Sequence, residues 1–160
     1  MDVAGPPELY RATTLSKAEH PFSHRVATRI YMMLIEPAIY LPSVLADFRV
    51  AGGQVVVRNF RDLTEVMGLK EQVIVNCTGL GAKALFNDEE LIPVKGQLTF
   101  LTPQPEINYM YISGSSYMFP RRDGVLLGGT HERGIWTTDP DESIISGMLE
   151  DHRRLAEGMR

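Results

Sequence analysis

A glycine turn between two apolar segments is the local feature of this sequence that most directly indicates chemistry. Residues 73–76 read Val-Ile-Val-Asn, and the turn after them contains the pattern Gly79-x-Gly81-x-x-Ala84. Glycines at this spacing, after a strand and before a helix, let a backbone approach a pyrophosphate at the helix N-terminus. The same glycines would also suit a tight turn with no ligand, so both interpretations stay open.

Three further side chains could contact a ligand. Thr78 places a hydroxyl at the predicted carboxyl end of a strand, where open α/β sheets bind ligands, although a helix N-cap is the alternative. Tyr117 could present its hydroxyl to a carboxylate, or could pack as an ordinary sheet tyrosine. Arg121 could hold a carboxylate with two parallel hydrogen bonds, or could remain a solvated charge beside a turn. The sequence offers no catalytic dyad.

Other residues have a predicted structural role. Gly128 and Gly129 end a predicted strand and permit close backbone approach, or a bulge. Glu36 follows an apolar segment, so its carboxylate needs a partner. Cys77 is expected to be a small buried apolar side chain.

The elements that position these residues begin with a predicted parallel α/β half. Residues 29–35 are a short apolar run typical of a buried strand, and a helix is expected from Pro42 to the glycines at Gly52. Residues 55–57 and 72–76 are predicted strands rich in valine and isoleucine. Strands that are apolar on both faces indicate a parallel sheet covered on both sides.

The second half predicts an antiparallel sheet with a helix. Residues 121–124, Arg-Arg-Asp-Gly, have the composition of a tight hairpin turn. Asp139 is expected to cap the last helix, with Pro140 in its first position. Residues 1–28 lack periodicity and predict a linker or an incomplete N-terminal segment. The strands expected in this half are 94–101, 108–112, 117–119 and 125–127.

Composition excludes several classes of protein. The 160 residues carry a net charge of -4, which argues against a nucleic-acid protein with a basic surface and against a polybasic membrane surface. The apolar runs are too short to span a bilayer, and the first residues lack the features of a signal peptide. One cysteine and four scattered histidines predict neither an internal disulfide nor a metal site. We therefore expect a soluble cytoplasmic protein.

The order of several motifs resembles the D-amino-acid oxidase family of FAD-dependent oxidoreductases, over about residues 29–155. The block Val-Asn-Cys-Thr-Gly at 75–79 is the most specific of these motifs, and Tyr-Met-Phe-Pro-Arg at 117–121 is shared with glycine and sarcosine oxidase relatives. The other matching motifs are Leu-Ile-Glu at 34–36, Tyr-Leu at 40–41, Gly-Gln-Val-Val-Val-Arg at 53–58, Gly-Gln at 96–97, and Leu-Gly-Gly-Thr at 127–130.

The resemblance implies a fold and a set of site residues. Residues 29–91 would be part of an FAD-binding, Rossmann-like parallel sheet, and residues 92–160 part of an antiparallel substrate-binding domain with a helix. Phe60 would meet the adenine end of FAD through its backbone, and Thr78 with Gly79 would lie beside the cofactor. Tyr117 would line the substrate pocket.

The resemblance also implies an activity, the FAD-dependent oxidation of a D-amino acid to an imino acid and then an oxo acid, with oxygen reduced to peroxide. The expected partners are an amino-acid substrate and oxygen, with no nucleic acid and no membrane; a homo-oligomer and a peroxisomal location both stay open. The resemblance matches no N-terminal glycine loop for the FAD pyrophosphate and no substrate arginine, so we expect the middle of such an enzyme. Ser113 stands where the family has a second pocket tyrosine, which leaves the substrate open.

Three alternatives remain. A glycine- or sarcosine-type amine oxidase would share the same motifs. A catalytically incompetent fragment would lack the pyrophosphate loop and the substrate arginine. A nicotinamide-dependent dehydrogenase rests only on the spacing of Gly79, Gly81 and Ala84.

Overall fold

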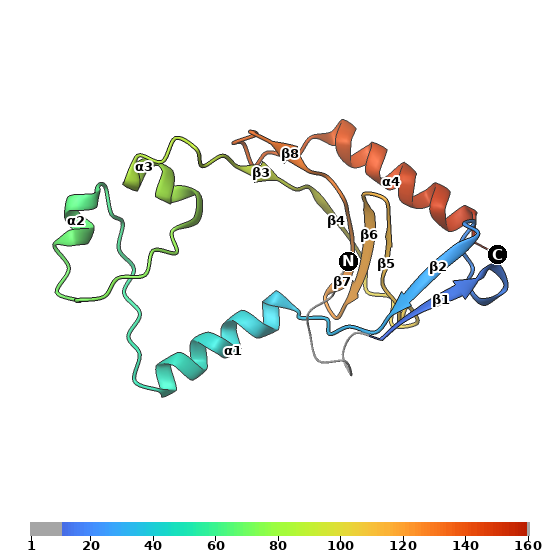
Figure 1. Ribbon diagram of the computed structural model, residues 1–160, viewed down its shortest axis with the longest axis horizontal. Helices are drawn as coiled ribbons and strands as arrows, with labels where there is room; N and C mark the ends of the chain where they lie inside the picture. Colours follow the sequence, from blue (N-terminus) through green and yellow to red (C-terminus); the bar gives the residue numbers. More distant parts are fainter. Residues whose placement is uncertain (1–10, 160) are drawn as a thin grey trace.

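The computed structural model describes residues 11–159, which form a mixture of helices and antiparallel sheets (Figure 1). The first residues, for which the sequence predicts no signal peptide, and the first part of the predicted linker lie outside these residues. The strands are β1 Ala12–Ser16, β2 Val26–Ile30, β3 Val94–Lys95, β4 Leu98–Leu101, β5 Tyr111–Ser113, β6 Ser116–Arg121, β7 Gly124–Gly128 and β8 Glu132–Arg133. The helices are α1 Pro37–Val50, α2 Leu63–Met67, α3 Ala82–Phe86 and α4 Glu142–Glu157, with short 3₁₀ turns η1 at Lys17–Glu19 and η2 at Gly79–Gly81.

The main sheet has four antiparallel strands in the order β4-β7-β6-β5, which confirms the antiparallel second half predicted from the sequence. Strands β6 and β7 form a hairpin in which Arg121 pairs with Gly124, so its loop has the two residues Arg122 and Asp123. The predicted turn is therefore in place. Two smaller antiparallel pairs, β1 with β2 and β3 with β8, flank this sheet.

One face of the main sheet packs against α4 and holds a small core. Met118, Val125 and Leu127 are buried together there. Tyr111 packs against this cluster and also contacts His152 of α4, which places the cluster and the helix on the same face. Because side chains alternate along a strand, Tyr117 and Phe119 point to the other face.

Helix α4 begins at a cap that differs from the predicted one. Asp141, not Asp139, is the N-cap, and its carboxylate accepts the backbone N–H groups of Ser143 and Ile144 at 2.9 and 3.3 Å. The backbone N–H of Asp141 in turn donates to the side-chain oxygen of buried Gln97 at 2.7 Å. This bond joins the start of the helix to the residue before β4, so the tertiary contact selects which aspartate caps.

The predicted parallel half differs most from the structure. Helix α1 confirms the expected helix and begins earlier, at Pro37. Strand β2 ends at Ile30, and residues 55–57 and 72–76 are not paired with any other part of the chain that the structure describes. Val57 is 98% exposed and Val73 is 83% exposed. A segment rich in β-branched residues becomes a strand only when a neighbouring strand pairs with its backbone N–H and C=O groups. These two segments have no such neighbour within residues 11–159.

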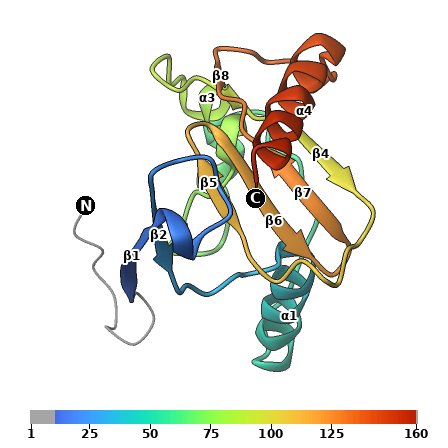
Figure 2. The same cartoon turned by 90° about the vertical axis from the view of Figure 1, so that its right-hand side faces the viewer.

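Segments α1 to α3 form an open arc that leaves the main sheet and returns to it at β3 (Figure 1). At the start of the arc, Glu36 accepts the backbone N–H of Arg122 at 3.2 Å and lies 3.8 Å from its guanidinium group. The partner expected for this carboxylate is thus the tip of the β6–β7 hairpin. Figure 2 shows α4 and the β1–β2 pair on the near side of the sheet, with the arc on the far side.

Strand β1 and the first three residues of β2 lie within residues 1–28, for which the sequence predicts a linker or an incomplete N-terminal segment. The five residue pairs of β1 with β2 run from Ala12 opposite Ile30 to Ser16 opposite Val26. The domain boundaries at 28 and 91 remain predictions. None of the helices in residues 11–159 is both long enough and apolar enough to span a bilayer.

We predict that the cap of α4 makes stability depend on pH. The Ser143 hydroxyl and then the backbone N–H groups of Ile144 and Ser143 lower the pKa of Asp141 in the folded chain. A lowered folded pKa contributes stability above the unfolded pKa, and that stability is lost as the pH falls through the folded value. Asp141→Ala should lower the melting temperature at neutral pH, and the difference from wild type should shrink toward pH 3, measured by circular dichroism.

Asp139→Ala is the matched control, because Asp139 was the predicted cap and its carboxylate accepts only the Thr137 hydroxyl among the described contacts. An equal loss of stability in the two variants would contradict the assignment of the cap.

Candidate functional site

The face of the main sheet opposite α4 carries an aromatic and cationic row. The Tyr117 and Phe119 rings lie 5.2 Å apart on β6. The Arg121 guanidinium follows on the same face and lies 5.3 Å from the centre of the Phe100 ring. Arg121 also makes two hydrogen bonds to the Asp123 carboxylate, at 2.9 and 2.5 Å. Its charge is therefore already paired, which favours a structural role over capture of a free carboxylate.

Two glycines at the end of β7 allow close packing, one against Tyr117 and the other against Ser115. A Cβ atom added to Gly128, which pairs with Tyr117 across the strands, would lie 2.2 Å from Cζ of the tyrosine ring. A Cβ added to Gly129 would lie 1.4 Å from the Ser115 carbonyl oxygen. Real side chains do not approach so closely, so this confirms the close backbone approach expected for these glycines.

The turn that contains Thr78 and Gly79 is exposed and ordered by one asparagine. The backbone N–H and the hydroxyl of Thr78 both donate to the Asn76 side-chain oxygen, at 3.1 and 2.7 Å. Thr78 precedes η2 but its hydroxyl makes no helix-capping bond. Asn76 is a functional-site neighbour that no prediction included, although an asparagine two residues before a turn residue is the typical signal for such a bond.

The backbone at Gly79 is open enough for a flat or phosphorylated ligand to approach it. It has a φ of +56°, and a Cβ placed on it would meet no atom within 4 Å. Helix α3, however, has only five residues and follows the 3₁₀ turn η2. The helix therefore adds little to anion binding, and what this turn offers a ligand is its open backbone at Gly79.

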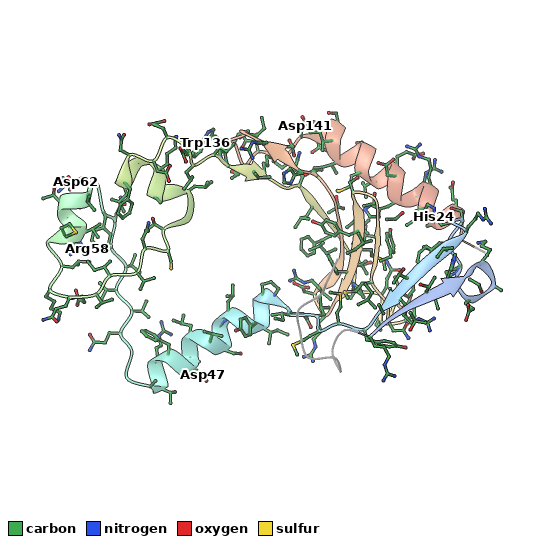
Figure 3. The ribbon with its side chains drawn as sticks, viewed as in Figure 1. His24, Asp47, Arg58, Asp62, Trp136 and Asp141 are labelled. Atoms are coloured by element: carbon green, nitrogen blue, oxygen red, sulfur yellow. The ribbon has the colours of Figure 1, made fainter. Side chains whose placement is uncertain are left out.

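The remaining residues of interest lie elsewhere on the arc. Phe60 is half-buried, and the Arg58 guanidinium lies 4.7 Å from the centre of its ring. Figure 3 labels Arg58 beside α2. Cys77 is exposed, contrary to the prediction, because the segment before it is unpaired.

The structure places the predicted site residues on one side of the sheet without bringing them into one cluster. Tyr117 packs on Phe119 and Gly128, Thr78 bonds to Asn76, and Phe60 meets Arg58. The arc that carries Phe60, Thr78 and Gly79 faces the same side of the sheet as Tyr117, and side chains of the sheet project toward it (Figure 3).

A hollow of about 1240 Å³ lies elsewhere, between β2, the loop before β5 and the β6–β7 hairpin. Phe60, Thr78, Gly79 and Tyr117 do not line it. We therefore build the candidate site on the open sheet face and not on this hollow. Within residues 11–159, no three histidine, cysteine or acidic side chains gather as metal ligands would.

Comparison with known proteins gives a consistent result. The model of the FAD dependent oxidoreductase family matches residues 4–159. A D-amino acid oxidase of Dugesia ryukyuensis is 32% identical over 121 residues, 74% of this chain and 36% of the relative. A D-amino-acid oxidase of Rubrobacter xylanophilus is 32% identical over 136 residues, 82% of this chain and 41% of the relative. A D-aspartate oxidase of Homo sapiens is 36% identical over 103 residues, 64% of this chain and 30% of the relative. The chain thus spans between 30% and 41% of the length of these three relatives.

The glycine pair gives a prediction about the site. Gly129→Ala should lower the free energy of unfolding by about 2 kcal/mol or more, because the added Cβ would clash with the Ser115 carbonyl oxygen, a backbone atom that cannot shift as easily as a side chain. Gly128→Ala should cost less, because it meets the movable ring of Tyr117, but it should displace that ring. Urea unfolding followed by circular dichroism measures the first effect.

Gly147→Ala is the control, because this glycine lies in α4 with no atom within 4 Å of an added Cβ. The change should raise stability by up to about 1 kcal/mol, since alanine favours helix. Equal effects at positions 129 and 147 would show that strand β7 does not approach Ser115 as described.

Proposed function

The chain belongs to the FAD dependent oxidoreductase family, and from this membership we propose that it supplies the substrate side and part of the cofactor side of an oxidase of D-amino acids. The observation that carries the proposal is the open sheet face on which Tyr117 and Phe119 lie, turned toward the arc with Thr78 and Gly79. The names of the relatives, D-amino acid oxidase and D-aspartate oxidase, support the substrate class.

When bound, FAD would supply the two-electron oxidation of the substrate at its α-carbon, with oxygen as the final electron acceptor that leaves as peroxide. The amine loses a proton and becomes an imine, which water hydrolyses to the oxo acid and ammonia. The chain's own residues would bind and orient. The Thr78–Gly79 turn and the Phe60 backbone would hold the cofactor, with Gly79 allowing the closest approach.

Tyr117 would hold the substrate. Its hydroxyl can donate to the substrate carboxylate, and its ring is fixed above Gly128 by the close packing described. Phe119 and Phe100 extend the same face and would keep water from the reacting carbon. The side chain of Ser113 lies in register with Ser116, on the α4 face, and its hydroxyl is 3.3 Å from Nε2 of His24. This position therefore does not line the Tyr117 face.

The domain assignment is part of the proposal. Residues 29–91 would form part of an FAD-binding α/β half, in which segments 55–57 and 72–76 become strands once neighbouring strands pair with them. Residues 92–160 would form part of the substrate-binding half. A glycine- or sarcosine-type amine oxidase would use the same face. The remaining alternative, a fragment without activity on its own, is the one to which the exposed valines within residues 55–57 and 73–75 are relevant.

Cofactor binding by the turn can be tested with two matched glycines. Gly79 and Gly114 have φ values of +56° and +61°, and neither would place a Cβ within 4 Å of another atom. Alanine at either position should therefore cost a similar amount of stability, about 1–2 kcal/mol. We expect wild type and Gly114→Ala to retain a flavin absorption band after excess FAD is removed, and Gly79→Ala to lose most of it.

Equal retention of flavin by the two alanine variants would show that the turn does not meet the cofactor. A folded wild-type chain that retains no flavin would favour the inactive fragment.

A further inference from the structure

A buried histidine of α4 contacts the same glycine that supports Tyr117. His152 is 5% exposed, and its Nε2 atom lies 2.9 Å from the Gly128 carbonyl oxygen. Its Nδ1 atom lies 2.5 Å from the Tyr111 hydroxyl. The imidazole therefore bridges strands β5 and β7 from the α4 face.

Hydrogen-bond chemistry fixes the direction of the contact with Gly128 and, for a neutral imidazole, also that of the contact with Tyr111. A carbonyl oxygen only accepts, so Nε2 of His152 carries the proton that it donates to Gly128. In the neutral imidazole Nδ1 is then an acceptor, and the Tyr111 hydroxyl donates to it. Burial raises the pKa of Tyr111, which keeps this hydroxyl protonated near neutral pH. Each polar atom of the bridge thus has one complementary partner.

The other face of Gly128 contacts Tyr117. The missing Cβ of this glycine would lie 2.2 Å from Cζ and 2.4 Å from the hydroxyl oxygen of Tyr117. Gly128 is the last residue of β7, where the strand ladder ends, and glycine has the greatest backbone freedom. Gly128 pairs with Leu98 and Tyr117 on the neighbouring strands, and His152 adds a hydrogen bond to its carbonyl from the α4 face.

We propose that His152 is a positioning residue that holds the Gly128 backbone and thereby sets the place of the Tyr117 ring on the substrate face. The effect on activity rests on the proposed function, because the position of Tyr117 affects activity only if Tyr117 binds the substrate. His152 touches neither substrate nor cofactor. It acts from the opposite face of the sheet, through one backbone carbonyl.

The rival explanation is that His152 only anchors α4 to the sheet. Met148 provides the comparison, because it is the other buried side chain of α4 and has no polar atom to bond Gly128. Loss of Met148 would loosen the helix through packing alone. Loss of the His152 hydrogen bonds would release Gly128 as well.

The test labels the six tyrosines of the chain with 3-fluorotyrosine and records fluorine NMR spectra, with Tyr117→Phe used to assign the Tyr117 signal. His152→Phe removes both hydrogen bonds and keeps a ring, whereas His152→Gln keeps a donor and an acceptor. We expect His152→Phe to shift and broaden the Tyr117 signal. His152→Gln should give a signal close to the wild-type position and line width, and Met148→Ala should leave the signal unchanged. Circular dichroism verifies that each variant is folded.

An unmoved Tyr117 signal in folded His152→Phe, or an equal change in Met148→Ala, would overturn the proposal. If His152→Phe does not fold, Tyr111→Phe is tested in its place. Loss of the Tyr111 hydroxyl, which orients His152, should shift the Tyr117 signal by less than the loss of His152 would. An unshifted signal would overturn the proposal. The spectra need neither flavin nor substrate. A failure of FAD binding would therefore count against the proposed function and leave this result intact.

Discussion

The absence of a side chain at Gly128 is the constraint on which the arrangement of the sheet depends. Tyr117 occupies one side of this residue and the His152 hydrogen bond reaches its carbonyl from the other. Any larger residue would push the tyrosine ring away from the sheet. The β6–β7 pair, the docking of α4 and the open aromatic face therefore meet at one backbone position. Its neighbour Gly129 extends the same constraint to the Ser115 backbone.

The two halves of the chain differ because their strands find partners in different ways. Antiparallel strands β5, β6 and β7 follow one another through short turns, so each pairs with the strand next to it in the sequence. Parallel strands need crossover connections and neighbours that come from distant segments. Residues 55–57 and 72–76 have the composition of such strands, and no described segment pairs with them. Their exposed valines fit a chain that spans less than half of its curated relatives.

The sequence predicted what local chemistry determines. The Arg-Arg-Asp-Gly turn, helix α4 and the tight packing at Gly128 depend on residues close in the chain or on the size of one residue, and all are present. The predictions of strands at 55–57 and 72–76 and of a buried Cys77 assumed a long-range partner that residues 11–159 do not provide. Asp141 caps α4 because Gln97, 44 residues away, binds its backbone, and no local pattern contains that information. The role of His152 was missed for the same reason, since its contacts reach across the sheet to Tyr111 and Gly128.

Stereoselective reduction of bound flavin tests the central claim most directly. The chain loaded with FAD would be mixed without oxygen with a D-amino acid, and in a second sample with its L-enantiomer. If the sheet face holds the substrate through Tyr117, the D-enantiomer should bleach the flavin band and the L-enantiomer should leave the band unchanged. Air should then restore the bleached band. A retained flavin that neither enantiomer bleaches, or that both bleach equally, would contradict the assignment of this chain to the oxidation of D-amino acids.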